Sequence, residues 1–310
     1  MSEKGEKMLQ LTMEEKKRYR DMLLNPGNLP FDAPEGYLDC LDAVDKEEVK
    51  ITGSEGQEIT VWITVPKDRR TGGMLYINIH GGGFVQPHHI WDDAICAIMA
   101  LEFQCTVIDI DYRLAPEYPH PAAIIDCYDV YRWAVENAKK LGIDPAKIAV
   151  GGNSAGGTLT AGVCMKADEN HFQVPALALM LYPECGLSVE ADDPQLSDNM
   201  DLSDLRARGI LYTLLYLQSE EQLEDPYANL LKADEALLGQ FPDTILITGG
   251  LDPLRFDAEE FAKHLAVSGS AIITKRFRNS KHGFYTRLTG EWREAREFVF
   301  HQIHNLMDRA

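Results

Sequence analysis

The chain has 310 residues, 45% of them hydrophobic, and it carries a formal net charge of −19 at pH 7. The apolar content is enough for a complete core, in one large domain or two small ones. The acidic balance disfavours nucleic-acid binding, because phosphate contacts need a basic stripe. No uncharged apolar run reaches the roughly 18 residues that a membrane-spanning helix needs.

The N-terminal stretch and the cysteines indicate the compartment. Residues 1–18 are highly charged and lack the apolar core of a signal peptide. The cysteines are scattered, mostly in apolar contexts, and form no C-x-x-C pair: they are Cys40, Cys96, Cys105, Cys127, Cys164 and Cys185. An even number would permit disulfides, but the contexts favour buried, reduced thiols, so we expect a cytoplasmic protein.

Helical and strand patterns alternate along most of the chain. A helical pattern with a polar face spans 8–24, and a turn-rich segment, 25–40, follows it. Eight strands are expected after that, at about 47–52, 58–65, 74–79, 105–110, 147–151, 176–182, 244–249 and 271–278. Helical patterns lie between the later strands and after them, at 92–102, 121–140, 155–168, 256–267 and 289–307. Because strand and helix alternate from residue 74 onward, we expect a single α/β domain.

The strand patterns are of two kinds. The first two alternate apolar and polar side chains, as in residues 61–65, which is typical of antiparallel strands at the edge of a sheet. The later ones are continuous apolar runs, such as residues 176–181, and these are typical of parallel strands covered on both faces. The chain therefore predicts a mostly parallel sheet with flanking helices.

One segment interrupts the alternation. More than 60 residues separate the sixth strand from the seventh, which is too long for a simple crossover. Residues 188–204 are acidic and polar, and 205–217 form an amphipathic helix candidate rich in tyrosine and leucine. We expect an insertion at about 187–225 to join an N-terminal cap segment, 1–45, in covering a site on the main domain, 46–310. The alternative is a peripheral decoration that does not touch a substrate.

A sharp turn with a serine at its apex follows the fifth strand. The sequence there is Gly152-Asn153-Ser154-Ala155-Gly156, and a helical pattern comes next. Only small flanking residues let the backbone pass so close, and the strained turn exposes the serine hydroxyl. A serine alone is a poor nucleophile, so this short motif gains meaning only if the chain also supplies a base and an oxyanion hole.

Three glycines at the end of the third strand supply a candidate oxyanion hole. The sequence His80-Gly81-Gly82-Gly83 comes directly after the apolar residues 75–79. Backbone N–H groups there can point into a site, and without Cβ atoms a substrate oxygen can approach to about 3 Å. An isolated triple glycine would more simply be a flexible loop, but two motifs in the order that one fold demands favour a functional role.

Chain order indicates the base and the acid. In a strand–turn–serine topology the partners come after the serine, first the acid and then the histidine. Of the nine histidines, His282 lies in a loop between the last strand and the last helix, where a base should project. Asp252 follows the seventh strand by two residues, so it can fix the imidazole tautomer and stabilise the imidazolium. Asp257 is the nearest competitor, and Glu184 is an alternative in a supporting position.

With these residues in place, the chain resembles the hormone-sensitive-lipase-like family of α/β-hydrolases, the bacterial family IV esterases. The resemblance covers roughly residues 74–305. Four segments carry it: His80-Gly81-Gly82-Gly83-Phe84; Asp111-Tyr112-Arg113-Leu114-Ala115-Pro116-Glu117; Gly152-Asn153-Ser154-Ala155-Gly156-Gly157; and Asp252-Pro253-Leu254-Arg255 with His282-Gly283-Phe284. It implies the α/β-hydrolase fold, an eight-stranded, mostly parallel sheet flanked by helices, with a helical cap on the catalytic domain.

The resemblance also implies roles for individual residues. They are a nucleophile, its two partners and three oxyanion-hole amides: Ser154; Asp252 and His282; Gly82, Gly83 and Ala155. The segment at Tyr112 and Arg113 would have a structural role, with a buried, hydrogen-bonded arginine. The sequence contains neither a metal-ligand spacing nor a nucleotide-binding glycine loop, so we expect no metal and no cofactor.

The chain departs from the family pattern near the expected site. Asn153 occupies the position where the family usually has an acidic residue. Asparagine keeps the shape of that side chain but lacks its charge. After Phe84, the segment 86–91 replaces a more usual small-residue turn. Four side chains are candidates for lining the substrate pocket: Phe84, His88, Trp91 and Tyr212. The histidine and the tryptophan of this set could equally pack beneath the cap.

The sequence thus predicts a serine carboxylesterase that hydrolyses short-acyl esters through an acyl-enzyme. Its partner would be a small-molecule ester, with no nucleic acid and no membrane, and a homodimer stays open. An amidase or arylformamidase on the same three residues is the first alternative, because the sequence does not show how well a poor leaving group is protonated. A small-molecule receptor on the hydrolase fold is the second, although such proteins typically lose the catalytic histidine.

Overall fold

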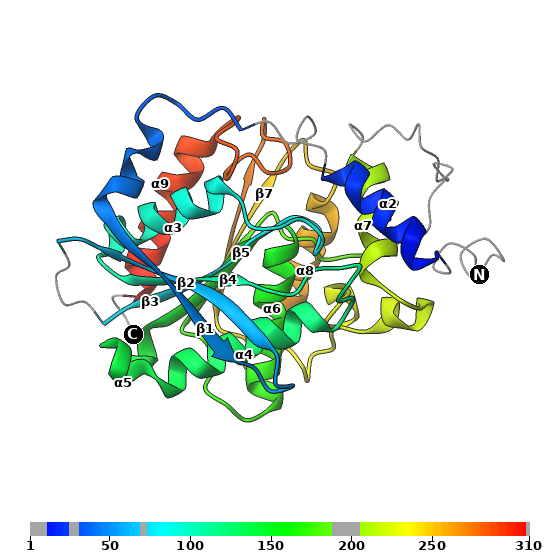
Figure 1. The fold of residues 1–310 in the computed structure, drawn as a ribbon, viewed down its shortest axis with the longest axis horizontal. Coiled ribbons are helices and arrows are strands. Elements are labelled where there is room, and N and C mark those ends of the chain that lie inside the picture. Colours follow the sequence, from blue (N-terminus) through cyan, green and yellow to red (C-terminus); the bar gives the residue numbers. More distant parts are fainter. Residues whose placement is uncertain (1–10, 25–30, 69–72, 188–204, 308–310) are drawn as a thin grey trace.

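A computed structural model describes residues 11–24, 31–68, 73–187 and 205–307 (Figure 1). Within these residues eight strands form one sheet, in the order β1-β2-β4-β3-β5-β6-β7-β8. The strands are β1 (Val44–Thr52), β2 (Glu58–Pro66), β3 (Leu75–Ile79), β4 (Thr106–Asp111), β5 (Ile148–Asn153), β6 (Leu177–Leu181), β7 (Asp243–Gly249) and β8 (Ile272–Phe277). The predicted eight-stranded α/β sheet is confirmed.

The sheet is mostly parallel. β1 runs antiparallel to β2, and β2 runs antiparallel to β4, whereas every later pairing is parallel. β2 is not itself an edge strand, because it lies between β1 and β4. All residues of β3, β5 and β6 are buried, but β8 forms the second edge and leaves most of its side chains partly exposed. Continuous apolar runs therefore mark the centre of the sheet.

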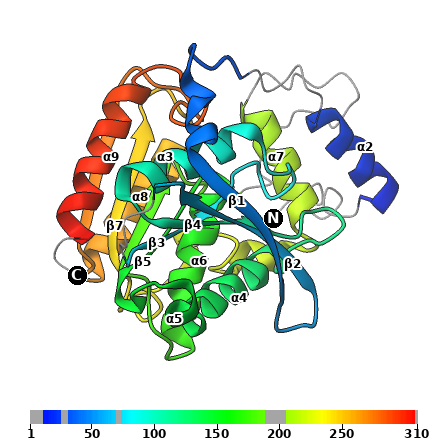
Figure 2. The same ribbon diagram turned by 60° about the vertical axis from the view of Figure 1, so that its left-hand side comes forward.

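Helices cover both faces of the sheet (Figures 1 and 2). The helices are α2 (Met13–Leu23), α3 (Ile90–Phe103), α4 (Ala122–Glu136), α5 (Ala138–Leu141), α6 (Ala155–Glu169), α7 (Leu205–Tyr216), α8 (Arg255–Val267) and α9 (Trp292–Met307), with short 3₁₀ helices at Tyr37–Ala43, Pro145–Lys147, Glu220–Glu224 and Leu230–Lys232. α3 and α9 share one core cluster, while α4, α6 and α8 pack on the opposite face. Successive side chains of a strand point to opposite faces of the sheet. Tyr76 therefore packs in the core cluster of α3 and α9, and Ile77 packs in the cluster on the opposite face. The helix expected over 121–140 is divided at Asn137, where α4 ends.

The helix α2 lies beside α7, the helix of the expected insertion, in both views (Figures 1 and 2). Tyr19 of α2 and Leu211 of α7 belong to the same core cluster. The ammonium Nζ of Lys16 donates to the carbonyl oxygen of Leu217 at 3.0 Å. Two segments far apart in the sequence thus pack together. Much of the expected insertion, 188–204, lies outside the described residues, so the division into cap and catalytic domain stays a prediction.

Two further expectations concern membranes and thiols. In the described ranges, no helix has the length and apolar character needed to cross a membrane. All six cysteines are free thiols; five are buried and Cys40 is partly exposed. The prediction of reduced, mostly buried thiols is confirmed, and burial raises the pKa of the Cys127 thiol, which makes it a poor nucleophile.

Candidate active site

Four loops meet at one edge of the sheet. β3, β5, β7 and β8 are mutually parallel, so their carboxyl ends lie along the same edge. His80, Ser154, Asp252 and His282 follow these strands in that order. The topology therefore explains how residues spread over two thirds of the chain come together.

Three of these side chains form a connected chain of polar contacts. The ring nitrogen Nε2 of His282 lies 3.0 Å from Ser154 Oγ, and its Nδ1 lies 2.7 Å from Asp252 Oδ2. The Asp252 side chain is only 1% exposed, and its second oxygen accepts the N–H of Leu254 at 2.9 Å. A carboxylate held in this way presents one oxygen to the imidazole and fixes its orientation.

Among the described residues, the two other carboxyl groups considered for the acid form no hydrogen bond with His282. Asp257 sits on α8 against Gly186, where a Cβ would approach its Oδ2 to 2.6 Å, and burial raises its pKa. Glu184 follows β6, and its backbone N–H donates to the Ser154 carbonyl at 3.3 Å. Asp252 is thus the carboxylate whose contact with His282 the structure describes.

The turn that carries Ser154 is strained. Ser154 has φ 53° and ψ −122°, a conformation that L-residues seldom adopt. A Cβ at Gly152 would lie 2.5 Å from the backbone of Gly156, and a Cβ at Gly156 would lie 2.0 Å from the carbonyl oxygen of Ile79. Both glycines are therefore required by backbone crowding, which is the physical content of the motif.

The glycines after β3 also have a special conformation. Gly82 and Gly83 have φ values of 119° and 62°. In the described part of the chain, the N–H groups of Gly82, Gly83 and Ala155 donate to no acceptor. Ala155 opens α6, and the first amides of a helix lack intrahelical partners. These three donors are available to an oxygen atom beside Ser154.

The segment at Tyr112 and Arg113 supports this loop from beneath. The Tyr112 hydroxyl donates to the carbonyl oxygen of His80 at 2.9 Å, and the two rings stack. Burial lowers the pKa of His80 to about 4, so its ring is neutral at pH 7. Arg113 donates to Asp126 and Glu55 but keeps 20% of its side chain exposed, so it is less buried than the resemblance implied.

The chain is similar to known hydrolases in both sequence and structure. A family model described as the α/β-hydrolase fold matches residues 76–286. The arylesterase of Saccharolobus solfataricus is 33% identical over 230 residues, which are 74% of this chain and 74% of that protein. The carboxylic ester hydrolase LipN of Mycobacterium tuberculosis is 34% identical over 249 residues, which are 78% of this chain and 64% of LipN. A hyperthermophilic esterase structure from Pyrobaculum calidifontis has a TM-score of 0.77 at 27% identity, with 97% of each chain covered.

The chain belongs to the hormone-sensitive-lipase-like family of α/β-hydrolases. It is a carboxylic ester hydrolase, as the sequence predicted.

A cavity opens onto Ser154 and His282 of this hydrolase. Its walls come from the glycine loop, the start of α3, the serine turn, α7 and the segments after β6, β7 and β8: Gly81, Gly82, Gly83, Gln86, Pro87, Trp91, Asn153, Ser154, Tyr182, Glu184, Leu205, Arg208, Gly209, Tyr212, Leu254, His282, Gly283, Thr286 and Arg287. Of the four pocket candidates, Trp91 and Tyr212 line the cavity. Asn153, the departure from the family pattern, lines it too.

Phe84 and His88 lie elsewhere, and their neighbours explain why. Phe84 is buried, and its ring stacks on that of Tyr216 with 3.8 Å between centroids. His88 pairs with Asp109 on β4 and lies against the ring of Trp62. Neither partner could be assigned from sequence, because each comes from a distant segment of the chain.

Glu184 contributes a neutral carboxyl group to the cavity wall. It is buried, and burial, followed by the charges of Asp252 and Asp257, raises its pKa to about 8. At pH 7 this side chain is therefore mostly protonated and adds no negative charge to the cavity.

Several cavity residues were not predicted from the sequence, among them Arg208 and Arg287. A signal existed for each of these two arginines. Arg208 precedes Tyr212 by four residues on a helix, so the two side chains share a face. Arg287 follows His282 by five residues in the same loop. The sequence does not show that these arginines face the serine, because that depends on how α7 and the loop pack.

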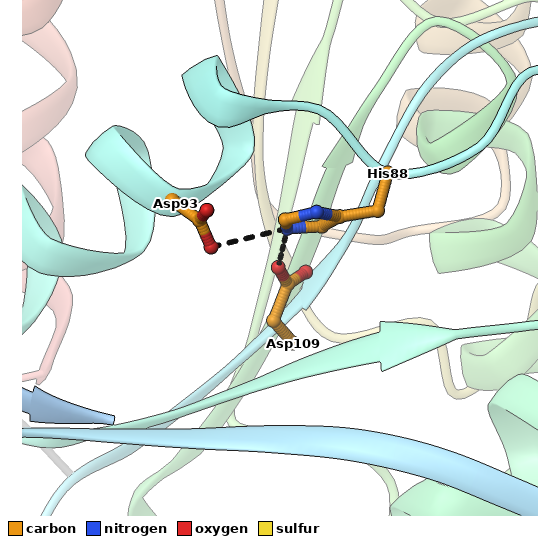
Figure 3. A group of neighbouring side chains, drawn as sticks. All are labelled: His88, Asp93 and Asp109. Atoms are coloured by element: carbon orange, nitrogen blue, oxygen red, sulfur yellow. Dashed lines mark ion pairs between the residues drawn. The ribbon is translucent and has the colours of Figure 1, made fainter. Parts of the chain in front are cut away.

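One group of side chains near the glycine loop has the composition of a metal site (Figure 3). The ring nitrogen Nε2 of His88 lies 2.6 Å from Asp109 Oδ2 and 3.4 Å from Asp93 Oδ1. Lys46 also pairs with Asp93. We call these four residues, Lys46, His88, Asp93 and Asp109, the His88 cluster.

The residues of the His88 cluster also pair with one another. Burial opposes the charged forms of His88 and Asp109, yet their mutual attraction raises the pKa of His88 and lowers that of Asp109. Lys46 and His88 therefore each pair with a carboxylate, and the pairing favours the cationic form of His88. The neighbouring Asp92 is buried, and burial followed by the Asp109 charge raises its pKa to about 8, so it is neutral at pH 7. The cluster is an ion-pair network.

Proposed function

We propose that the hydrolase cleaves short-acyl carboxylic esters through a covalent acyl-enzyme on Ser154. One observation carries the proposal: His282 contacts Ser154 Oγ through Nε2 at 3.0 Å and Asp252 through Nδ1 at 2.7 Å. An imidazole between a serine hydroxyl and a buried carboxylate can accept the serine proton and hold the resulting charge.

The first step forms a tetrahedral intermediate on Ser154. Nε2 of His282 accepts the proton of Ser154 as Oγ attacks the ester carbonyl carbon. The carbonyl oxygen becomes an oxyanion, and the free N–H groups of Gly82, Gly83 and Ala155 donate to it. Because Ala155 begins α6, the positive end of that helix adds to the stabilisation.

The following steps form the acyl-enzyme and release both products. His282 gives its proton to the departing alcohol, and the acyl group stays on Ser154. Water then gives a proton to His282 and attacks the acyl carbon, which forms a second tetrahedral intermediate. This intermediate breaks down to the free acid, and His282 returns the proton to Ser154 Oγ. Asp252 stays ionised throughout and holds the tautomer in which Nε2 faces Ser154.

The cover over the cavity supports a short acyl group. A Cβ at Gly83 would lie 2.3 Å from the ring of Tyr212, so that ring sits directly on the glycine loop. Leu205 and Gly209 of α7 line the same side. A roof this close limits how far an acyl chain can extend from Ser154.

A fluorophosphonate probe tests the nucleophile. We expect the probe to add to Ser154, so that the mass of its peptide shifts in the wild type and not in Ser154→Ala. Ser268→Ala is the matched control, because Ser268 caps the end of α8 and does not line the cavity. It should be labelled like the wild type. Unimpaired ester hydrolysis by Ser154→Ala would overturn the proposal.

The amidase alternative needs only a matched pair of substrates. We expect turnover of p-nitrophenyl acetate and little of p-nitroacetanilide, which differ in the atom that leaves. Comparable kcat/KM on the two would favour the amidase.

A further inference from the structure

Two arginines face the cavity that holds Ser154 and His282. Arg208 projects from the first turn of α7, and Arg287 comes from the loop after β8. The backbone N–H of Arg287 donates to Gly283, and a Cβ at Gly283 would lie 3.2 Å from Arg287 Nε. The Arg287 side chain therefore folds back beside the residue that follows His282.

Neither guanidinium has a counter-ion in the described part of the chain. No carboxylate there forms an ion pair with Arg208 or Arg287, and the Nε atom of Arg208 is buried without a hydrogen-bond partner. Burial, followed by the charge of Arg208, lowers the pKa of the Arg287 guanidinium. Two like charges that act on each other in a partly closed cavity are unfavourable until an anion joins them.

Among the described residues, the remaining groups of the cavity do not supply that anion. Glu184, the carboxylic acid of the described lining, is mostly protonated at pH 7. Gln86 and Tyr212 form a hydrogen bond with each other, in which the amide Nε2 of Gln86 donates to the hydroxyl of Tyr212 at 2.7 Å. Trp91 lies under Arg287, with 6.0 Å from the guanidinium carbon to the ring centroid. An aromatic ring can hold a guanidinium flat and leave its donor edge open.

We propose that Arg208 and Arg287 form a subsite for an anionic group of the substrate, so that the ester carries a carboxylate as well as the bond that is cleaved. This inference rests on the proposed function, since it names the substrate class of the same site. A guanidinium presents several N–H donors in a fork that matches a carboxylate, and a second cation adds to the attraction. The overall charge of −19 repels anions at long range, so the selectivity arises from these two residues.

Matched ester pairs test the subsite from both sides of the scissile bond. For an anion on the acyl side, monoethyl succinate is compared with ethyl levulinate, in which a methyl ketone replaces the carboxylate. For an anion on the alcohol side, p-acetoxybenzoate is compared with p-acetoxyacetophenone. The readout is the ratio of kcat/KM for the charged ester to kcat/KM for its neutral partner. Comparing this ratio between variants cancels the different reactivities of the two esters.

We expect Arg287→Gln and Arg208→Gln each to lower this ratio by about tenfold or more for at least one pair, the loss typical of a charge-assisted hydrogen bond. Arg132→Gln is the matched control, because Arg132 pairs with Glu136 on α4 outside the cavity and its loss changes the net charge equally. Its ratio should stay within about twofold of the wild type, since exposed charges at a distance are screened.

The outcomes separate this inference from the proposed function. Hydrolysis of the neutral esters with ratios that neither arginine variant changes would overturn the anionic subsite and leave the esterase intact. If no ester is hydrolysed, the proposed function fails, and calorimetry still tests the subsite through binding of p-acetoxybenzoate to Ser154→Ala. Binding that weakens by about tenfold when Arg287→Gln is added supports the subsite. No binding, or binding that is equal in both proteins, overturns it.

Discussion

The His88 cluster and the arginine pair differ in how their charges are compensated. In the His88 cluster, His88 touches Asp109 and Lys46 touches Asp93, so each cation has a carboxylate partner within the protein. In the cavity, the guanidinium groups of Arg208 and Arg287 have no such partner among the described residues. Buried charges are stable when they are paired. The first group is therefore complete without a ligand, whereas the second becomes complete when an anion binds.

The difference also predicts which property each region controls. The His88 cluster links β4 to the start of α3 and to β1, and its Asp109 accepts a hydrogen bond from Asn78 of β3 at 2.8 Å. Changes there should act on stability. The cavity residues surround Ser154, so changes there should act on turnover and substrate choice.

The largest expected effect is on the cavity side. Asp252→Asn should lower kcat by on the order of 10⁴, because an amide favours the wrong tautomer of His282. Hydrolysis of p-nitrophenyl acetate measures the loss, and an unchanged melting temperature shows that the fold is intact. Asp257→Asn is the matched control and should keep most of the activity. A large loss in Asp257→Asn with near wild-type Asp252→Asn would assign the acid to Asp257.

The contrast between the regions shows what the sequence could predict. The eight strands were predictable from their apolar patterns. The serine turn was predictable because backbone crowding demands glycine at 152 and 156. The order of the loops followed from parallel topology. His88 was harder, since its carboxylate partner, Asp109, is brought to it by the sheet rather than by nearby sequence.

The arginines illustrate a further limit of sequence reasoning. Arg113 and Arg287 are the same residue type. Arg113 forms ion pairs with Asp126 and Glu55, whereas Arg287 forms none with a carboxylate in the described ranges. Whether a charge is paired is a property of tertiary neighbours. The break at Asn137 between α4 and α5 was not predicted either, because the helical pattern continues across it.

The second effect concerns the His88 cluster. Asp109→Asn should lower the free energy of unfolding by about 3–5 kcal/mol, as expected when one partner of a buried ion pair is removed. Urea unfolding measures the change. Glu58→Gln, which removes an exposed pair with Lys50, is the control and should shift the urea midpoint little.

Melting temperatures of the wild type and of Asp109→Asn distinguish an ion-pair cluster from a metal site. If the charges of His88, Asp93 and Asp109 balance with Lys46, neither EDTA nor added Zn²⁺ should shift the melting temperature of the wild type. A melting temperature that rises with Zn²⁺ in the wild type and not in Asp109→Asn would instead make the cluster a metal site, and the comparison with the arginine pair would fail.

A smaller effect concerns the roof of the cavity. Each buried CH₂ adds about 0.8 kcal/mol, or about fourfold in kcat/KM, until the pocket is full. With the ring of Tyr212 against Gly83, kcat/KM on p-nitrophenyl esters should peak at roughly two to six acyl carbons and then fall. Tyr212→Ala should move the maximum to longer chains. A wild-type maximum on long-chain emulsions would contradict the short-acyl proposal.

The smallest effect concerns Glu184, whose pKa is about 8 in the folded protein, against an ordinary value of 4.5. Between these values the folded protein keeps a proton that the unfolded chain has released, so the free energy of unfolding falls as pH rises through this window. Glu184→Gln removes that dependence. The melting temperature of the variant minus that of the wild type should therefore increase by a few degrees from about pH 5 to pH 8. Glu235→Gln, at an exposed position, is the control. A gap that is constant with pH would show that Glu184 ionises normally.

The titration of Glu184 also tests the arginine subsite. Above about pH 8 the deprotonated carboxylate would place a negative charge in the same cavity as Arg208 and Arg287. The preference for p-acetoxybenzoate over p-acetoxyacetophenone should then weaken as pH rises through about 8 in the wild type. In Glu184→Gln it should stay level over that range, because no carboxylate forms. A preference that weakens equally in both proteins would mean that Glu184 does not offset the charge of the arginines.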